Sequence, residues 1–145
     1  TNSSVLLCYL RKEESACCAA PVPSNFTLPH DELPWATPRV FAAGGAQRLE
    51  VERLSPDSFV LCFEAEAVAC RLGALEPQRH ELQAFGPELR LGQGHALVSV
   101  SAVSAGRRVA VCTRSTAGLR CHWALVGPGL GLTWAAEEEG IAVTL

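Results

Sequence analysis

The chain alternates short apolar runs with polar turns, and one arrangement of them recurs three times. Residues 4–9, 58–63 and 108–113 are apolar runs whose fifth residue is a cysteine, and these cysteines stand 54 and 50 residues apart. A second cysteine follows in each case after seven to nine residues. The first cysteines are Cys8, Cys62 and Cys112, and the second are Cys17 or Cys18, Cys70 and Cys121. Self-similarity at such a period indicates a repeat architecture.

Two further landmarks keep the same spacing. Trp35, Phe85 and Trp134 each stand near an extended segment and are 50 and 49 residues apart. Residues 49–54 and 98–103 alternate in polarity and lead into turns, which is typical of half-buried strands that enter hairpins. The repeat therefore extends beyond the cysteines to the whole chain.

One unit is predicted to be an antiparallel meander of four strands, at residues 49–54, 59–63, 67–75 and 88–91, with a loop at 76–81. The chain is then a single repeat domain over 1–145. A partial unit at 1–43 holds the last three strands, 44–93 and 94–138 are full units, and 139–145 form a first strand for the first or the next unit. The predicted fold class is all-β.

Two architectures fit about three such units. Four-strand meanders of this length are typical of β-propeller blades, but natural propellers have roughly four to eight blades. Three units would therefore need other protein subunits, or a second copy of the chain in head-to-tail order, to complete a ring. A β-trefoil is the alternative, because it closes three four-strand units within one chain.

Residues 49–63, followed by Ala69-Cys70-Arg71-Leu72, resemble a propeller-like repeat of secreted proteins from dinoflagellates and other marine algae. Those repeats also carry a valine-rich run with Val-Cys-Tyr and a second strand with Cys-Arg-Val. The resemblance is strongest at 34–75 and 85–126, and the first copy departs from it by its doubled cysteine and a Pro-rich loop. It implies a propeller-like fold and brings no catalytic residues with it.

The cysteines are expected to form disulfides within hairpins. If the second and third strands pair, the two cysteines of a unit lie opposite each other, at a distance that a disulfide accepts. The expected pairs are Cys8 with Cys17 or Cys18, Cys62 with Cys70, and Cys112 with Cys121. Buried reduced thiols are the alternative.

Disulfides would place the protein outside the cell or in an oxidising lumen, of the secretory pathway or of the thylakoid. Both asparagines, Asn2 and Asn25, stand in glycosylation sequons, so glycosylation is predicted at both.

Composition and motifs exclude several other functions. The net charge is −3 and Lys12 is the one lysine, so no nucleic-acid surface is expected, and no apolar run is long enough for a membrane span. The four histidines occupy unrelated points of the repeat, and no nucleophile elbow, phosphate loop or zinc spacing is present. No enzymatic activity, metal or cofactor is therefore expected.

The sequence favours a structural or protein-interaction module that belongs to a larger lumenal or extracellular assembly. The alternative is a carbohydrate-binding lectin, in which Trp35, Phe85 and Trp134 stack on the apolar faces of sugars of a glycan partner. The competing interpretation of these aromatics is a packing role between units.

Overall fold

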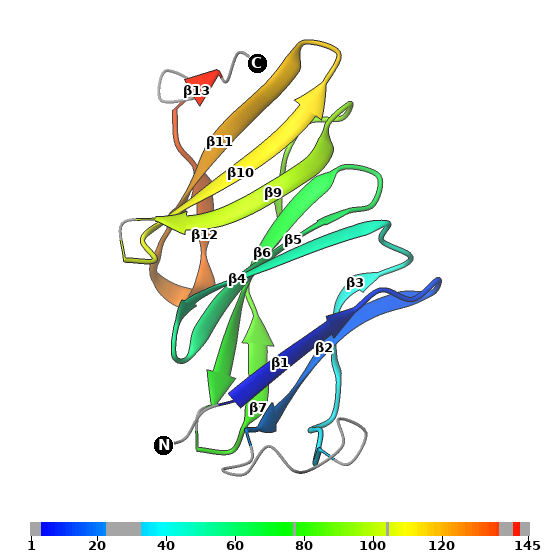
Figure 1. The fold of residues 1–145 in the computed structure, drawn as a ribbon, viewed down its shortest axis with the longest axis vertical. Coiled ribbons are helices and arrows are strands. Elements are labelled where there is room, and N and C mark those ends of the chain that lie inside the picture. Colours follow the sequence, from blue (N-terminus) through cyan, green and yellow to red (C-terminus); the bar gives the residue numbers. More distant parts are fainter. Residues whose placement is uncertain (1–3, 23–32, 77, 104, 137–140, 143–145) are drawn as a thin grey trace.

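The computed structural model describes residues 4–22, 33–76, 78–103, 105–136 and 141–142, and they form three antiparallel sheets (Figure 1). Each sheet is built from strands that follow one another in the chain. The first sheet has the order β1 (Ser4–Tyr9), β2 (Glu14–Pro21) and β3 (Arg39–Ala43). The second has the order β4 (Arg48–Ser55), β5 (Ser58–Glu64), β6 (Val68–Glu76) and β7 (Glu81–Phe85), and β8 (Leu89–Arg90) also pairs with β6.

The third sheet repeats the plan of the second. Its order is β9 (Ala96–Val103), β10 (Arg108–Ser115), β11 (Gly118–Val126) and β12 (Leu132–Trp134), and β13 (Ile141–Ala142) also pairs with β11. The 3-10 turn η2 (Pro128–Leu130) precedes β12. The predicted all-β class and antiparallel meanders are thereby confirmed.

The fourth strand of the unit has two segments, and the prediction found only the second. β8 at Leu89–Arg90 confirms the strand expected at 88–91, and it pairs with β6. The loop expected at 76–81 is shorter, because β6 continues to Glu76 and β7 starts at Glu81, and these two residues are paired. Glu81–Phe85 escaped prediction because the strand buries only Leu82 and therefore lacks a clear apolar run.

The end of the chain also pairs differently from the expectation of a first strand at 139–145. Arg120 and Cys121 of β11 lie opposite Ala142 and Ile141. In the second sheet, Leu89 takes the same place opposite Cys70. In the described part, Ile141–Ala142 are therefore a second segment of the fourth strand of their own unit.

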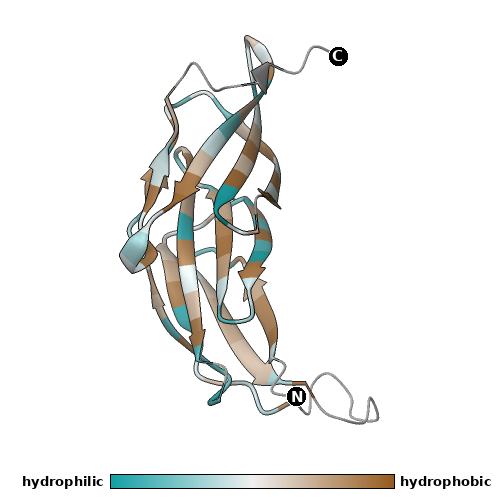
Figure 2. Cartoon of the chain, turned by 90° about the vertical axis from the view of Figure 1, so that its left-hand side faces the viewer, coloured by the Kyte–Doolittle hydropathy of each residue, from teal (hydrophilic) through white to brown (hydrophobic). Residues whose placement is uncertain are grey.

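Brown bands lie along the strands of the stack in Figure 2, and in β5 five consecutive apolar residues, 59–63, place apolar side chains on both faces of the second sheet. We call the face that carries the cysteine pair the cysteine face and the opposite face the back face. Leu6 and Cys8 of the first sheet share one buried cluster with Phe59, Leu61 and Phe63 of the second. The cysteine face of the first sheet thus packs against the back face of the second.

The second and third sheets pack in the same sense. Val60, Cys62 and Cys70 lie in one buried cluster with Val109 and Val111 of the third sheet. The cysteine face of the second sheet therefore covers the back face of the third, and the three sheets follow one another along the long axis (Figure 1). The stack has a direction: among the described residues, no further sheet covers the back face of the first sheet or the cysteine face of the third.

Gly73 provides a direct test of this packing. A Cβ atom at Gly73 would overlap the ring of Phe59, which fills the core between the first two sheets. We expect Gly73→Ala to lower the free energy of unfolding by about 1–3 kcal/mol, because it overfills that core. Urea denaturation measures this change.

Gly92→Ala is the matched control, because a Cβ atom at Gly92 meets nothing within 4 Å. Its free energy of unfolding should be equal to or above that of the wild type. Equal stability of both variants would contradict the packing of Phe59 described above.

Candidate functional site

The cysteines form the three expected hairpin disulfides. The bonds join Cys8 to Cys17, Cys62 to Cys70, and Cys112 to Cys121. In each hairpin the two cysteines lie directly opposite each other, with Cα atoms 3.9 to 4.1 Å apart. Three such bonds point to an oxidising compartment.

Cys17 is the partner of Cys8, and Cys18 keeps a free thiol. Neighbouring residues of a strand point to opposite faces, so Cys18 lies on the back face of the first sheet. It is 4% exposed, and burial raises the pKa of its thiol. The predicted glycosylation sites Asn2 and Asn25 lie outside the described residues.

The repeated aromatics occupy equivalent backbone positions. The residue after each of them donates a backbone hydrogen bond to the residue two positions after the second cysteine of the unit. These bonds are Ala36 to Ala19 (2.8 Å), Gly86 to Leu72 (2.7 Å) and Ala135 to Trp123 (2.8 Å). The spacing of the aromatics in the sequence therefore reflects one structural position, repeated in every unit.

Two of these aromatics pack between sheets. Phe85 meets Phe41 and Phe59 edge to face, with ring centroids 6.1 and 6.0 Å apart. Trp134 packs on the cluster between the second and third sheets, and its indole N–H donates to the backbone oxygen of Arg90 at 2.9 Å. Trp35 is half-buried at the equivalent position of the first sheet.

Arg71 links the first two sheets in a way that the sequence did not reveal. Its guanidinium donates to the backbone oxygens of Phe41 at 2.7 Å and Gly86 at 2.8 Å, and it lies 5.3 Å from the Phe85 ring centroid. It follows Cys70 directly, so the position was visible only as part of the Cys-Arg motif. Cys18 and His122 stand at the same position in the other two units.

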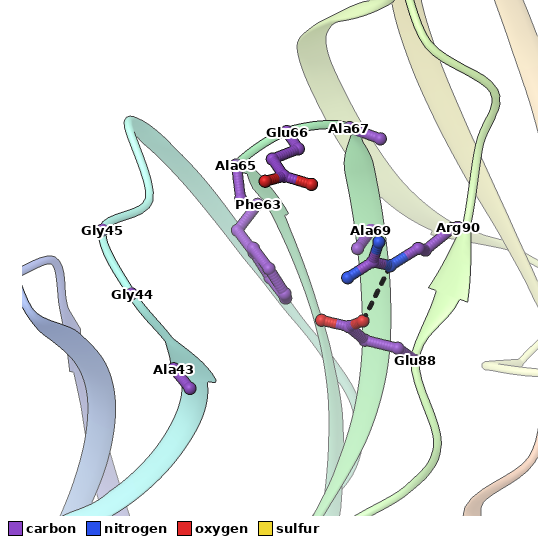
Figure 3. Close-up of a pocket in the computed structure, with 10 residues that line it drawn as sticks. All are labelled: Ala43, Gly44, Gly45, Phe63, Ala65, Glu66, Ala67, Ala69, Glu88 and Arg90. Atoms are coloured by element: carbon purple, nitrogen blue, oxygen red, sulfur yellow. Dashed lines mark hydrogen bonds and ion pairs between the residues drawn. The ribbon is translucent and has the colours of Figure 1, made fainter.

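A pocket of about 400 Å³ opens between the first and second sheets, at the end where β5 turns into β6 (Figure 3). Phe63 and Ala69 line its apolar side, and the turn residue Glu66 lies at its mouth. The carboxylate of Glu88 accepts a hydrogen bond from Arg90 at 2.9 Å across the pocket wall. This exposed ion pair adds little to the stability of the fold. Both of its charged groups line the pocket, where a polar group can contact them.

His95 and His122, which occupy different positions of the repeat, lie close together at the third sheet. The buried Thr113 hydroxyl lies 3.1 Å from Nδ1 of His95 and 3.4 Å from Nε2 of His122. Desolvation by burial lowers the pKa of His122, and the charges of His95 and Arg120 lower it further. Burial thus favours the neutral form of His122, and the Thr113 hydroxyl has the capacity to donate to one ring nitrogen and accept from the other.

Each end face of the stack is exposed in part. On the back face of the first sheet, Leu7 is 45% exposed, although its equivalents Leu61 and Val111 are fully buried. On the same face, Ala16, Cys18 and Ala20 of β2 are buried. Likewise, the Cys112–Cys121 disulfide on the third sheet is half-buried, whereas Cys62 and Cys70 are fully buried. Leu7 and this disulfide are therefore more exposed than their equivalents inside the stack.

Comparisons with protein-family models, with curated proteins and with solved structures find no match to this chain. In the part of the chain that the structure describes, no helix has the length and apolar character needed to cross a membrane. The described residues also contain no group of three or more Cys, His, Asp and Glu side chains placed to hold a metal ion.

The disulfide assignment predicts one alkylated cysteine in the denatured, unreduced protein, because six of the seven cysteines are bonded. Peptide mass spectrometry should place the label on Cys18, and the Cys18→Ala variant should take up none. A label on Cys17, or three labelled cysteines, would contradict the assignment.

The histidine pair predicts a pH dependence of stability. Because the pKa of His122 is lower in the fold than its ordinary value of 6.5, the unfolded chain binds a proton there first as the pH falls. The stability is complete above about pH 6.5 and decreases below it. Urea midpoints measured from about pH 8 to about pH 5.5 should fall less in His122→Gln than in the wild type.

The His122→Gln comparison isolates one histidine, since the remaining histidines are the same in both proteins. Glutamine also keeps a polar group beside the Thr113 hydroxyl. Identical pH profiles for the two proteins would show that His122 has the same pKa in the folded and unfolded chain.

Proposed function

We propose that this protein is a non-catalytic β-repeat module that packs against other protein surfaces within a larger lumenal or extracellular assembly. The observation that carries the proposal is the exposure of apolar residues on the end faces at positions that are buried inside the stack. Leu7 of β1 and Val40 of β3, on the back face of the first sheet, are 45% and 44% exposed. Exposed apolar surface of this kind suits an interaction surface.

Most cysteines and two of the repeated aromatics have structural roles in the described part of the chain, which supports a module over an enzyme. Six cysteines are held in disulfides, and Phe85 and Trp134 pack between sheets. The Glu88–Arg90 ion pair lies in an open pocket between sheets, where it suits a polar side chain of a protein partner.

A propeller-like arrangement of the units is part of the proposal. Two full units are four-strand meanders, and all three sheets face the same way along the stack, as blades do. The first strands β4 and β9 contact each other, and so do β8 and β12 toward the other edge. The β-trefoil has less support, because the first and third sheets lie at opposite ends of the stack (Figure 1).

The lectin alternative is tested by the repeated aromatics. Phe85→Ala and Trp134→Ala should each lower the free energy of unfolding by about 2–4 kcal/mol, because each removes a ring from a core between sheets. Trp35→Ala, in the first sheet, should lower the free energy of unfolding by less than either of these substitutions. Denaturation with urea, together with a glycan array of the wild type, provides the measurements.

No glycan signal is expected from the wild-type protein. A signal that Trp35→Ala abolishes, while the free energy of unfolding stays unchanged, would support the lectin and overturn the proposed function.

A further inference from the structure

We propose that a second copy of this chain covers the end faces. The cysteine face of the third sheet of one copy would pack against the back face of the first sheet of the other. The inference rests on the proposed function, because it names the partner of the same exposed faces.

The first step is that these faces are the two halves of one kind of interface. Inside the chain, a cysteine face meets a back face twice, between the first and second sheets and between the second and third. One cysteine face and one back face remain at the ends. A contact between them would continue the order that the chain already contains.

The second step is the exposure of matched residues on the back face. Leu7 stands at the position of Leu61 in the second sheet and Val111 in the third. Both equivalents are 0% exposed because a neighbouring sheet covers them, whereas Leu7 is 45% exposed. The residue at this position is apolar in all three sheets, and Leu7 differs only in that no neighbouring sheet of the described residues covers it.

The cysteine face of the third sheet shows the same difference. Ala110 stands at the position of the fully buried Val60, and Trp123 at that of Leu72, which is 2% exposed. Ala110 and Trp123 themselves are half-buried, as is the disulfide beside them. This apolar surface is of the kind that the back face of another sheet covers inside the chain.

The third step is that the numbers of the two kinds of end face are equal. Every copy has one free face of each kind, so a second copy supplies the missing half of both contacts. The interface is heterologous, since different surfaces meet, and it yields a closed ring or an open array according to the rotation between copies. A two-copy ring would also supply a number of units within the range of natural propellers.

Sedimentation velocity of the oxidised protein over a range of concentrations tests the inference. We expect the wild type to self-associate. Leu7→Glu on the back face and Ala110→Glu on the cysteine face should each weaken association at least about tenfold, because each would place an unpaired carboxylate in the contact. Val40→Glu and Trp123→Glu serve as second variants, should either of the first two fail to fold by circular dichroism.

Val51→Glu is the matched control. Val51 is 38% exposed, similar to Leu7, but it lies on β4 in the middle of the stack and outside both end faces. The Val51→Glu variant should self-associate as strongly as the wild type. Weakening by Val51→Glu equal to that by Leu7→Glu would show that the association does not depend on the end faces.

Mixing the variants distinguishes a head-to-tail contact from a symmetric one. Leu7→Glu retains an intact cysteine face and Ala110→Glu retains an intact back face, so the mixture should form a complex that neither variant forms alone. A wild type that stays monomeric, or a mixture that gains no complex, would overturn the second-copy inference. Either result would leave the proposed function standing, because the exposed residues of the end faces would still be open to a different protein partner.

Discussion

The second sheet of this protein must bury two apolar faces, and the rest of the structure depends on that constraint. A sheet in water can leave one face exposed only if that face is polar. Here Phe59 and Leu61 point to one side of β5, while Val60 and Cys62 point to the other, and all four are buried. Such a strand requires a neighbour on both sides, so the sheets stack in series.

The stack acquires its direction from differences between the two faces. One face carries the compact disulfide, and the other carries larger side chains such as Phe59 and Leu61 in the second sheet. Gly73 leaves room for the Phe59 ring, and Arg71 fastens the back face of the second sheet to the backbone of β3. These features explain why cysteine faces meet back faces, and why both ends of the stack remain apolar.

The sequence was sufficient to predict the hairpins and their disulfides, because the apolar runs and cysteine spacings are local signals. It could not decide between Cys17 and Cys18, since that choice depends on the register of β1 and β2, which places Cys17 opposite Cys8. It also missed Glu81–Phe85, which buries only Leu82, and the approach of His95 to His122. His95 stands just before β9 and His122 lies in β11, so only the folded sheet brings them together.

The account is tested most directly by contacts between methyl groups of different sheets in solution. In a methyl-labelled sample, nuclear Overhauser effects measure which side chains lie close together. Cross-peaks should join Val60 or Leu72 to Val109 or Val111, and Leu6 to Leu61, because these pairs share the cores between sheets. Cross-peaks confined to residues within single sheets would contradict the stacked arrangement on which the proposed interaction surfaces depend.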